Sequence, residues 1–161
     1  MQTRREILTV LVASSAALAQ SKPNFSGRWQ VDPSRGTFAA PADLTEVIDH
    51  REAAISIDTT VNMSQGTGLA LASLLAPRMR LTTNGAQDSN AMPMGLSLAS
   101  QSHWQGDRLV TEWRISGMPN GAMTGSWARS LADGGRSMIV ELTAIAGDRR
   151  VEAKLLFVRK D

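Results

Sequence analysis

One stretch decides the fold of this 161-residue chain: Asn24-Phe25-Ser26-Gly27-Arg28-Trp29-Gln30-Val31-Asp32-Pro33-Ser34-Arg35. Apolar and polar residues alternate from Phe25 to Val31 well enough for a β-strand. The turn-forming residues Asp32, Pro33 and Ser34 then end the alternation. The stretch is therefore predicted to be the first strand of a small antiparallel barrel.

Short alternating runs separated by turns continue to the end of the chain. Alternation is clearest in residues 54–63 and 108–116, where every second residue is apolar or threonine. Turn signals such as Asn84-Gly85 recur roughly every 8–12 residues, whereas the polar stretch from Ala86 to Pro93 is predicted to be a loop. The pattern predicts an all-β fold: an antiparallel up-and-down meander that closes into a barrel of about 8–10 strands, in one domain over residues 20–161.

Residues 69–76 are the ambiguous segment, because they read Leu-Ala-Leu-Ala-Ser-Leu-Leu-Ala. This composition has high helix propensity, and Pro77 would end a helix. A short helix near 68–76 that caps a barrel mouth is the preferred interpretation, and a strand is the alternative.

Residues 1–19 are predicted to be an export signal. A charged start with Arg4 and Arg5 precedes the apolar run Ile7 to Leu18, and small residues place cleavage between Ala19 and Gln20. The apolar run is shorter than the roughly 20 residues of a membrane-spanning helix, and no second run of spanning length follows. The start also resembles a twin-arginine signal, with an ordinary secretory signal as the alternative. The mature protein is expected outside the cytoplasm, in the periplasm or the extracellular space.

Composition excludes several kinds of chemistry. Cysteine is absent, which excludes disulfides, thiol catalysis and zinc–cysteine sites. The net charge is only +2 and the basic residues are scattered, so no nucleic-acid partner is expected. The sequence also lacks the nucleophile elbow, the phosphate-binding glycine loop and the zinc-protease motif. No catalytic residue, cofactor or metal is predicted.

Histidines and methionines are the remaining candidates for metal chemistry. A site would need His50 and His103 close together, with Asp49 or Glu46 completing the shell. His103 lies opposite Trp104 in the strand alternation and is expected to face solvent, so a structural or surface role is favoured for both histidines. The methionines around Met92-Pro93-Met94 suggest copper capture, with ordinary packing as the preferred interpretation.

Gly27-Arg28-Trp29 resembles the G-x-W signature of lipocalins and their calycin relatives. In that fold a tryptophan closes one barrel end and an arginine near the last strand packs across it, a pairing that the resemblance assigns to Trp29 and Arg159. Together with residues 24–29, the stretches 104–110 and 131–134 are similar to secreted bacterial lipocalin-like proteins of unassigned role. The absence of cysteine, and of a recognisable helix after the last strands, departs from lipocalins proper.

The resemblance implies an interior that either holds one small ligand or is filled by side chains. Small hydroxyls among apolar groups suit a ligand cavity as well as a filled interior. The candidate lining residues are Ser100, Ser102, Trp104, Thr111, Trp113 and Trp127. The favoured function is a non-catalytic barrel that binds a small apolar ligand or a partner surface. A lipocalin-like isomerase or cyclase, and a structural envelope module, are the alternatives.

Overall fold

The computed structural model describes residues 21–37, 40, 43–61 and 77–161. The predicted export signal, the Ala19–Gln20 cleavage point and the helix expected near 68–76 lie outside these residues.

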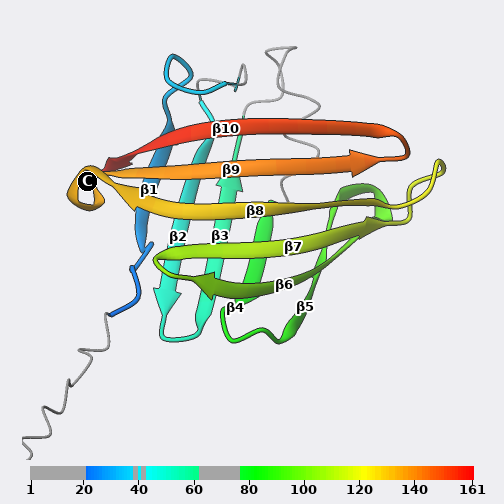
Figure 1. Ribbon diagram of the computed structural model, residues 1–161, viewed down its shortest axis with the longest axis horizontal. Coiled ribbons are helices and arrows are strands. Elements are labelled where there is room, and N and C mark those ends of the chain that lie inside the picture. The colour runs from blue at the N-terminus through cyan, green and yellow to red at the C-terminus, as the bar shows by residue number, and fades with distance from the viewer. Residues whose placement is uncertain (1–20, 38–39, 41–42, 62–76) are drawn as a thin grey trace, which may run out of the picture.

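The described chain is almost entirely β-structure (Figure 1). It has two short 3-10 turns, Pro93–Gly95 and Asp133–Gly135. Its strands are β1 (Gly27–Val31), β2 (Thr45–Arg51), β3 (Ala54–Thr60), β4 (Arg78–Thr82), β5 (Gln87–Ala91), β6 (Ser97–Gln105), β7 (Arg108–Ser116), β8 (Met123–Ala132), β9 (Ser137–Ala146) and β10 (Arg149–Lys160).

The strands form one antiparallel sheet of ten, in the order β4-β3-β2-β1-β10-β9-β8-β7-β6-β5. Every strand pairs with its neighbour in sequence, except that β4 and β5 do not pair with each other. The first strand pairs with the last, from Arg28 opposite Lys160 to Val31 opposite Phe157, and the two edge strands β4 and β5 face each other. In Figure 1, β6 to β10 run horizontally in front and β1 to β4 run vertically behind. The predicted all-β antiparallel meander is confirmed, with ten strands rather than the eight of lipocalins.

Side chains bridge the β4–β5 seam. Asn90 Oδ1 accepts a hydrogen bond from Arg80 N at 2.7 Å, and Asn90 Nδ2 donates to Arg80 O at 2.9 Å. Asp88 accepts from Thr82 N at 2.6 Å and from the Thr82 hydroxyl at 2.8 Å. These bonds satisfy backbone groups that a sheet edge would otherwise leave unpaired.

The prediction of a loop over residues 86–93 was wrong, because residues 87–91 form β5. This strand has no apolar face, since it reads Gln-Asp-Ser-Asn-Ala. Backbone pairing with β6 holds one side of it, and the carboxylate and amide side chains just described hold the other. Strand preference reflects how a side chain fits its neighbours more than an intrinsic tendency of the residue.

The core lies inside the barrel and takes alternate residues from most strands. In β7, for example, the burial pattern alternates from Leu109 to Ile115. Fully burying one such large apolar side chain contributes about 1.5–3 kcal/mol. The largest fully buried apolar side chains are Trp29, Phe25, Phe157, Leu44, Ile57, Leu98, Leu109, Ile115 and Met138.

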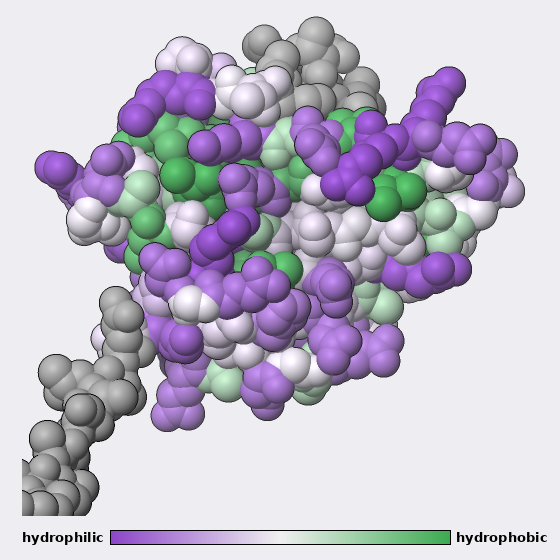
Figure 2. All heavy atoms as spheres, viewed as in Figure 1, coloured by the Kyte–Doolittle hydropathy of each residue, from purple (hydrophilic) through white to green (hydrophobic). Residues whose placement is uncertain are grey.

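The outer surface is mostly polar, with few large apolar side chains exposed. Figure 2 shows charged and polar residues spread over one face, with apolar residues between them. Met94 is the most exposed of the four large apolar residues on the described surface, the others being Val47, Ile145 and Val151. No helix in the described part of the chain is long and apolar enough to cross a membrane.

Candidate functional site

Trp29 and Arg159 meet where the first and last strands pair. The register places them opposite each other, and Arg159 Cζ lies 4.6 Å from the centroid of the fully buried Trp29 ring. The guanidinium also donates to Ser26 O at 2.9 Å and to Gly135 O at 3.0 Å. The structure thus brings together the pair that the lipocalin resemblance had assigned.

Gly27 makes this arrangement possible. Its φ is +145°, a conformation that residues with side chains rarely adopt. A Cβ at this position would lie only 2.8 Å from Arg159 Nη1. The glycine of Gly27-Arg28-Trp29 therefore leaves the space in which the arginine crosses the tryptophan.

The segment before β1 covers the same region of the barrel. Phe25 is fully buried, and its ring stacks on His50 at 5.9 Å and on Trp104 at 6.0 Å between centroids. Lys22 Nζ lies 5.7 Å from the Trp104 ring. Trp104, expected to line a ligand cavity, is thus partly buried within this covering cluster.

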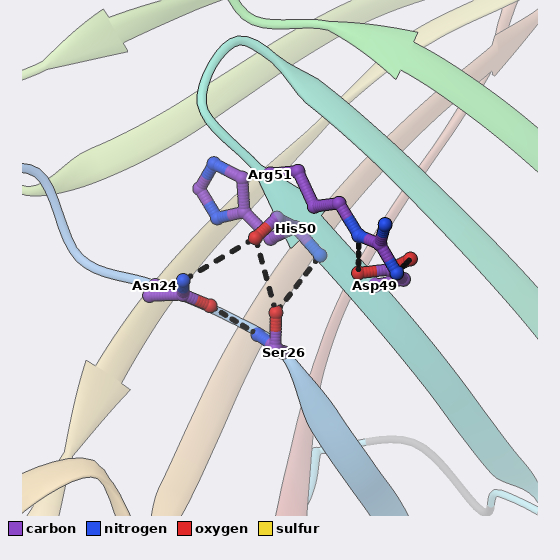
Figure 3. A network of polar contacts seen from close by, with 5 residues as sticks. All are labelled: Asn24, Ser26, Asp49, His50 and Arg51. Carbon is purple, nitrogen blue, oxygen red and sulfur yellow. Dashed lines mark hydrogen bonds and ion pairs between the residues drawn. The ribbon is translucent and has the colours of Figure 1, made fainter.

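Asn24 and Ser26 fix that segment to the end of β2, as Figure 3 shows. Asn24 Nδ2 and Ser26 Oγ both donate to His50 O, at 3.3 and 3.2 Å. Ser26 Oγ also accepts from His50 N at 2.9 Å. The covering segment is therefore held by hydrogen bonds as well as by ring stacking.

His50 occupies a structural position in this cluster. Its Nδ1 accepts from Phe25 N at 3.3 Å, so its Nε2 carries the proton and donates to Glu52 O at 3.1 Å. Burial lowers the pKa of His50, and the bond to Glu52 O opposes that shift. The imidazole is therefore held in its neutral form.

Metal chemistry finds no support in this arrangement. Both ring nitrogens of His50 on β2 already have partners. His103 lies on β6, where its Nε2 contacts the side chain of Gln105 on the same strand. Among the described residues, no three histidine, aspartate or glutamate side chains gather as a metal site would require. Met92 is buried in the core and Met94 is exposed, so the two do not converge.

All six predicted lining residues lie on β6, β7 and β8. Five of them form one inner wall, and Trp104, near the end of β6, belongs to the covering cluster. Ser102 Oγ and Thr111 Oγ1 satisfy each other at 2.8 Å. The rings of Trp113 and Trp127 stack at 5.3 Å, and Gly125, opposite Trp113 in the register, leaves room for the Trp113 ring. Ser100 also lies opposite Trp113.

Two polar atoms on this wall have no partner. Ser100 Oγ and Trp113 Nε1 are both buried and form no hydrogen bond. Most buried polar groups in native proteins are hydrogen-bonded, so each exception requires an explanation. An indole N–H and a hydroxyl at paired positions of one inner wall can orient a bound molecule by hydrogen bonds.

A buried ion pair crosses the interior from β2 to β8. Arg129 Nη2 lies 2.9 Å from Glu46 Oε1, and their side chains are only 4% and 2% exposed. The second oxygen of this carboxylate, Glu46 Oε2, and the Nε of Arg129 are buried without partners. Among the residues that the structure describes, four buried side-chain polar atoms thus have unused hydrogen-bonding capacity.

The sequence analysis missed this pair. Glu46 was considered only as a metal ligand, and Arg129 was not singled out. The available signal was the strand alternation: Glu46 is in phase with the buried Ile48 of β2, and Arg129 is in phase with the buried Trp127 of β8. Charged residues at such positions point toward the barrel interior.

No protein-family model matches the sequence, and no curated protein is significantly similar to it. Solved structures do match. A REP1-NXSQ fatty acid transporter is 13% identical, with 85% of this chain and 96% of that chain covered and a TM-score of 0.56. The zebrafish ileal bile acid-binding protein complexed with cholic acid is 10% identical, with 84% and 98% covered and a TM-score of 0.54.

A third similar structure is secretory abundant heat soluble protein 4 from Ramazzottius varieornatus. It is 12% identical, covers 89% of this chain and 100% of its own, and has a TM-score of 0.58. At these identities the likeness shows the fold alone. The chain therefore has a calycin-like fold, an antiparallel β-barrel of ten strands.

Proposed function

We propose that this protein is an exported, non-catalytic carrier that holds one small, largely apolar molecule inside its barrel. The observation that carries the proposal is the set of buried, unpaired polar atoms on inward-facing side chains. Leaving such a group without a partner costs about 1–3 kcal/mol. A ligand with a polar group would remove that cost.

Ser102 and Thr111, on the same wall, differ from Ser100 and Trp113 in that their polar groups are paired. These two neighbouring hydroxyls satisfy each other, as expected in a barrel filled by its own side chains. Two register positions along, on the same face, Ser100 and Trp113 do not. An apolar wall that carries a few unsatisfied polar groups is typical of a small-molecule site.

The comparisons support the same class of ligand. Two of the similar structures carry names that describe them as a fatty acid transporter and a bile acid-binding protein. Fatty acids and bile acids are apolar molecules with a polar head. An interior of stacked tryptophans and aliphatic side chains suits the apolar part of such a molecule.

The test is to recover the bound ligand together with the protein from the compartment to which the protein is exported. The protein is purified from the periplasm or culture medium without detergent and is examined by native mass spectrometry. A bound mass released by organic solvent is the expected result. In parallel, the neutral apolar probe N-phenyl-1-naphthylamine should become fluorescent on binding and quench the emission of Trp113 and Trp127.

A filling variant gives a second readout. Ser100→Leu places a larger apolar group on the inner wall and should weaken probe binding by at least about tenfold. Ser97→Leu is the matched control, because Ser97 lies on the same strand but is exposed, and it should bind as the wild type does. Folded wild-type protein that retains no ligand and binds no probe would contradict the proposal.

Export is a separate part of the proposal and rests on the composition of residues 1–19. Fractionation of cells that express the full chain should find the shortened protein outside the cytoplasm, with Gln20 as its first residue. Replacing Arg4 and Arg5 together by lysine should stop export if the signal is of the twin-arginine type. Unchanged export would indicate the general secretory route, and retention of the uncut wild-type chain in the cytoplasm would refute export.

A further inference from the structure

We infer that the interior ligand is an uncharged molecule whose head group both donates and accepts hydrogen bonds, such as a primary amide or an alcohol, rather than a carboxylate. The inference rests on the proposed function, because it describes the occupant of the same interior. It follows from how the buried charges are distributed.

Charge inside the barrel is already balanced. Glu46 and Arg129 are the buried members of the Asp, Glu, Lys and Arg classes in the described part of the chain, and they pair with each other. His50 has both ring nitrogens occupied by backbone groups in its neutral form. Residues 62–76 contain no ionisable side chain in the sequence. An ionised ligand would therefore enter without a free counter-charge.

Arg159 does not change this balance. Its guanidinium lies over Trp29 and donates to the carbonyl groups of Ser26 and Gly135. Its position is fixed by the closing strands, and it is only partly buried. Asp88 is similarly engaged, because its two oxygens accept from the backbone and the hydroxyl of Thr82.

The unused hydrogen-bonding capacity of the ion pair defines the head group. Arg129 Nε offers one unpaired donor, and Glu46 Oε2 offers one unpaired acceptor. A primary amide or a hydroxyl presents both complementary functions. A carboxylate offers only acceptors, so it would leave Glu46 Oε2 unsatisfied and would bring a second negative charge toward Glu46. Burying a charge without a partner is far more costly than burying a hydrogen-bonded neutral group.

The second unpaired set agrees with a neutral guest. Ser100 provides a hydroxyl and Trp113 an indole N–H, and neither carries a charge. Hydrogen bonds to neutral donors stabilise an anion much less than a cationic partner does. Neither unpaired set therefore supplies the free cation that a buried carboxylate needs.

The experiment compares a saturated fatty acid with the primary amide and the alcohol of the same chain length. Each competes with N-phenyl-1-naphthylamine for the wild-type protein at about pH 8, where the acid is ionised. The amide and the alcohol are expected to bind at least about tenfold more tightly than the acid. An acid that binds as tightly as the neutral compounds, or more tightly, overturns the inference and leaves the carrier function standing.

Substitutions in the Glu46–Arg129 ion pair should either weaken or preserve the preference for a neutral head group over a carboxylate. In Glu46→Gln, Arg129 loses its counter-charge, and the acid should gain at least about tenfold in affinity relative to the wild type. In the double variant Glu46→Gln with Arg129→Gln the interior is again neutral, and the wild-type order of the three head groups is expected. Glu141→Gln is the matched control, because it breaks the exposed ion pair with Arg108 and should change nothing.

Stability is measured for each variant, because removing one partner of a buried ion pair is destabilising. If Glu46→Gln fails to fold, the competition experiment on the wild type and the double variant still test whether the interior prefers a neutral head group. An acid preference in the neutral double variant would overturn the inference. Failure of all three compounds to bind the folded wild type would instead refute the carrier function, and the inference with it.

Discussion

Asn90 bonds to Arg80 as one strand bonds to another, although it uses its side chain. Its amide accepts from Arg80 N and donates to Arg80 O, at 2.7 and 2.9 Å. The amide of Asn90 thus takes the place of a backbone pairing at Arg80. Because Asn90 is buried, water competes poorly for these bonds.

Asn90→Ala should therefore destabilise the protein by about 1–3 kcal/mol, because it leaves the N–H and C=O of Arg80 without partners. The free energy of unfolding in urea measures this. Gln87→Ala is the control on the same strand, since Gln87 is exposed, and should fall within about 0.5 kcal/mol of the wild type. A similarly small effect of Asn90→Ala would show that the seam does not depend on this amide.

Trp29→Ala should cost about 3–5 kcal/mol, as large-to-small changes at buried aromatic positions do. The ring is fully buried, its Nε1 donates to Phe25 O at 2.9 Å, and Arg159 packs across it. Urea unfolding monitored by far-UV circular dichroism gives the value. A loss below about 1 kcal/mol would mean that the ring contributes no more than a surface residue.

Gly125→Ala should be destabilising by about 1–3 kcal/mol, which is the usual cost of overpacking. A Cβ there would lie closer than 3.0 Å to the Trp113 ring and to Thr143 O. The near-ultraviolet circular dichroism of the Trp113–Trp127 stack should change with it. Ser126→Ala, at the next position of β8, is the control and should leave both the spectrum and the stability unchanged.

The stability of the protein should fall as the pH drops below about 6.5, the ordinary pKa of histidine. Burial lowers the pKa of His50 in the folded state, so the unfolded chain takes up a proton at a higher pH than the folded one. The stability that neutral His50 contributes to the folded state is complete above the ordinary histidine pKa. It is lost as the pH falls through the folded-state pKa of His50. Titration of the His50 ring signals by NMR should give a midpoint below 6.5, and a midpoint at or above that value would refute the effect.

The sequence was sufficient to predict an all-β meander because apolar residues repeat in its strands with a period of two. Ile55 and Ile57, or Leu109 and Trp113, identify an inner face without any knowledge of the neighbouring strands. Trp29 and Arg159 were accessible only through the resemblance to lipocalins. Local periodicity thus predicts faces, and pairing between distant strands needs further information.

β5 and the buried ion pair escaped prediction for one physical reason. Asp88 and Asn90 are strand residues because β4 lies beside them, and Glu46 is buried because Arg129 faces it across the barrel. In each case the partner comes from a different strand. Strand alternation places Glu46 and Arg129 on the inner faces of their strands. That the two residues pair with each other, and that Asp88 and Asn90 belong to a strand, becomes apparent only when the neighbouring strand is known.

The pairing of β1 with β10 also sets the order of events in folding. Arg159 reaches Ser26 across 133 positions of sequence, so closing this seam requires the ends of a very long loop to meet. Barrels dominated by such distant contacts fold on the slow side of the range for single domains, in about milliseconds to seconds. A nascent chain that still lacks β10 leaves the outer edge of β1 open and Trp29 without its covering arginine, so the barrel closes only after β10 has been made.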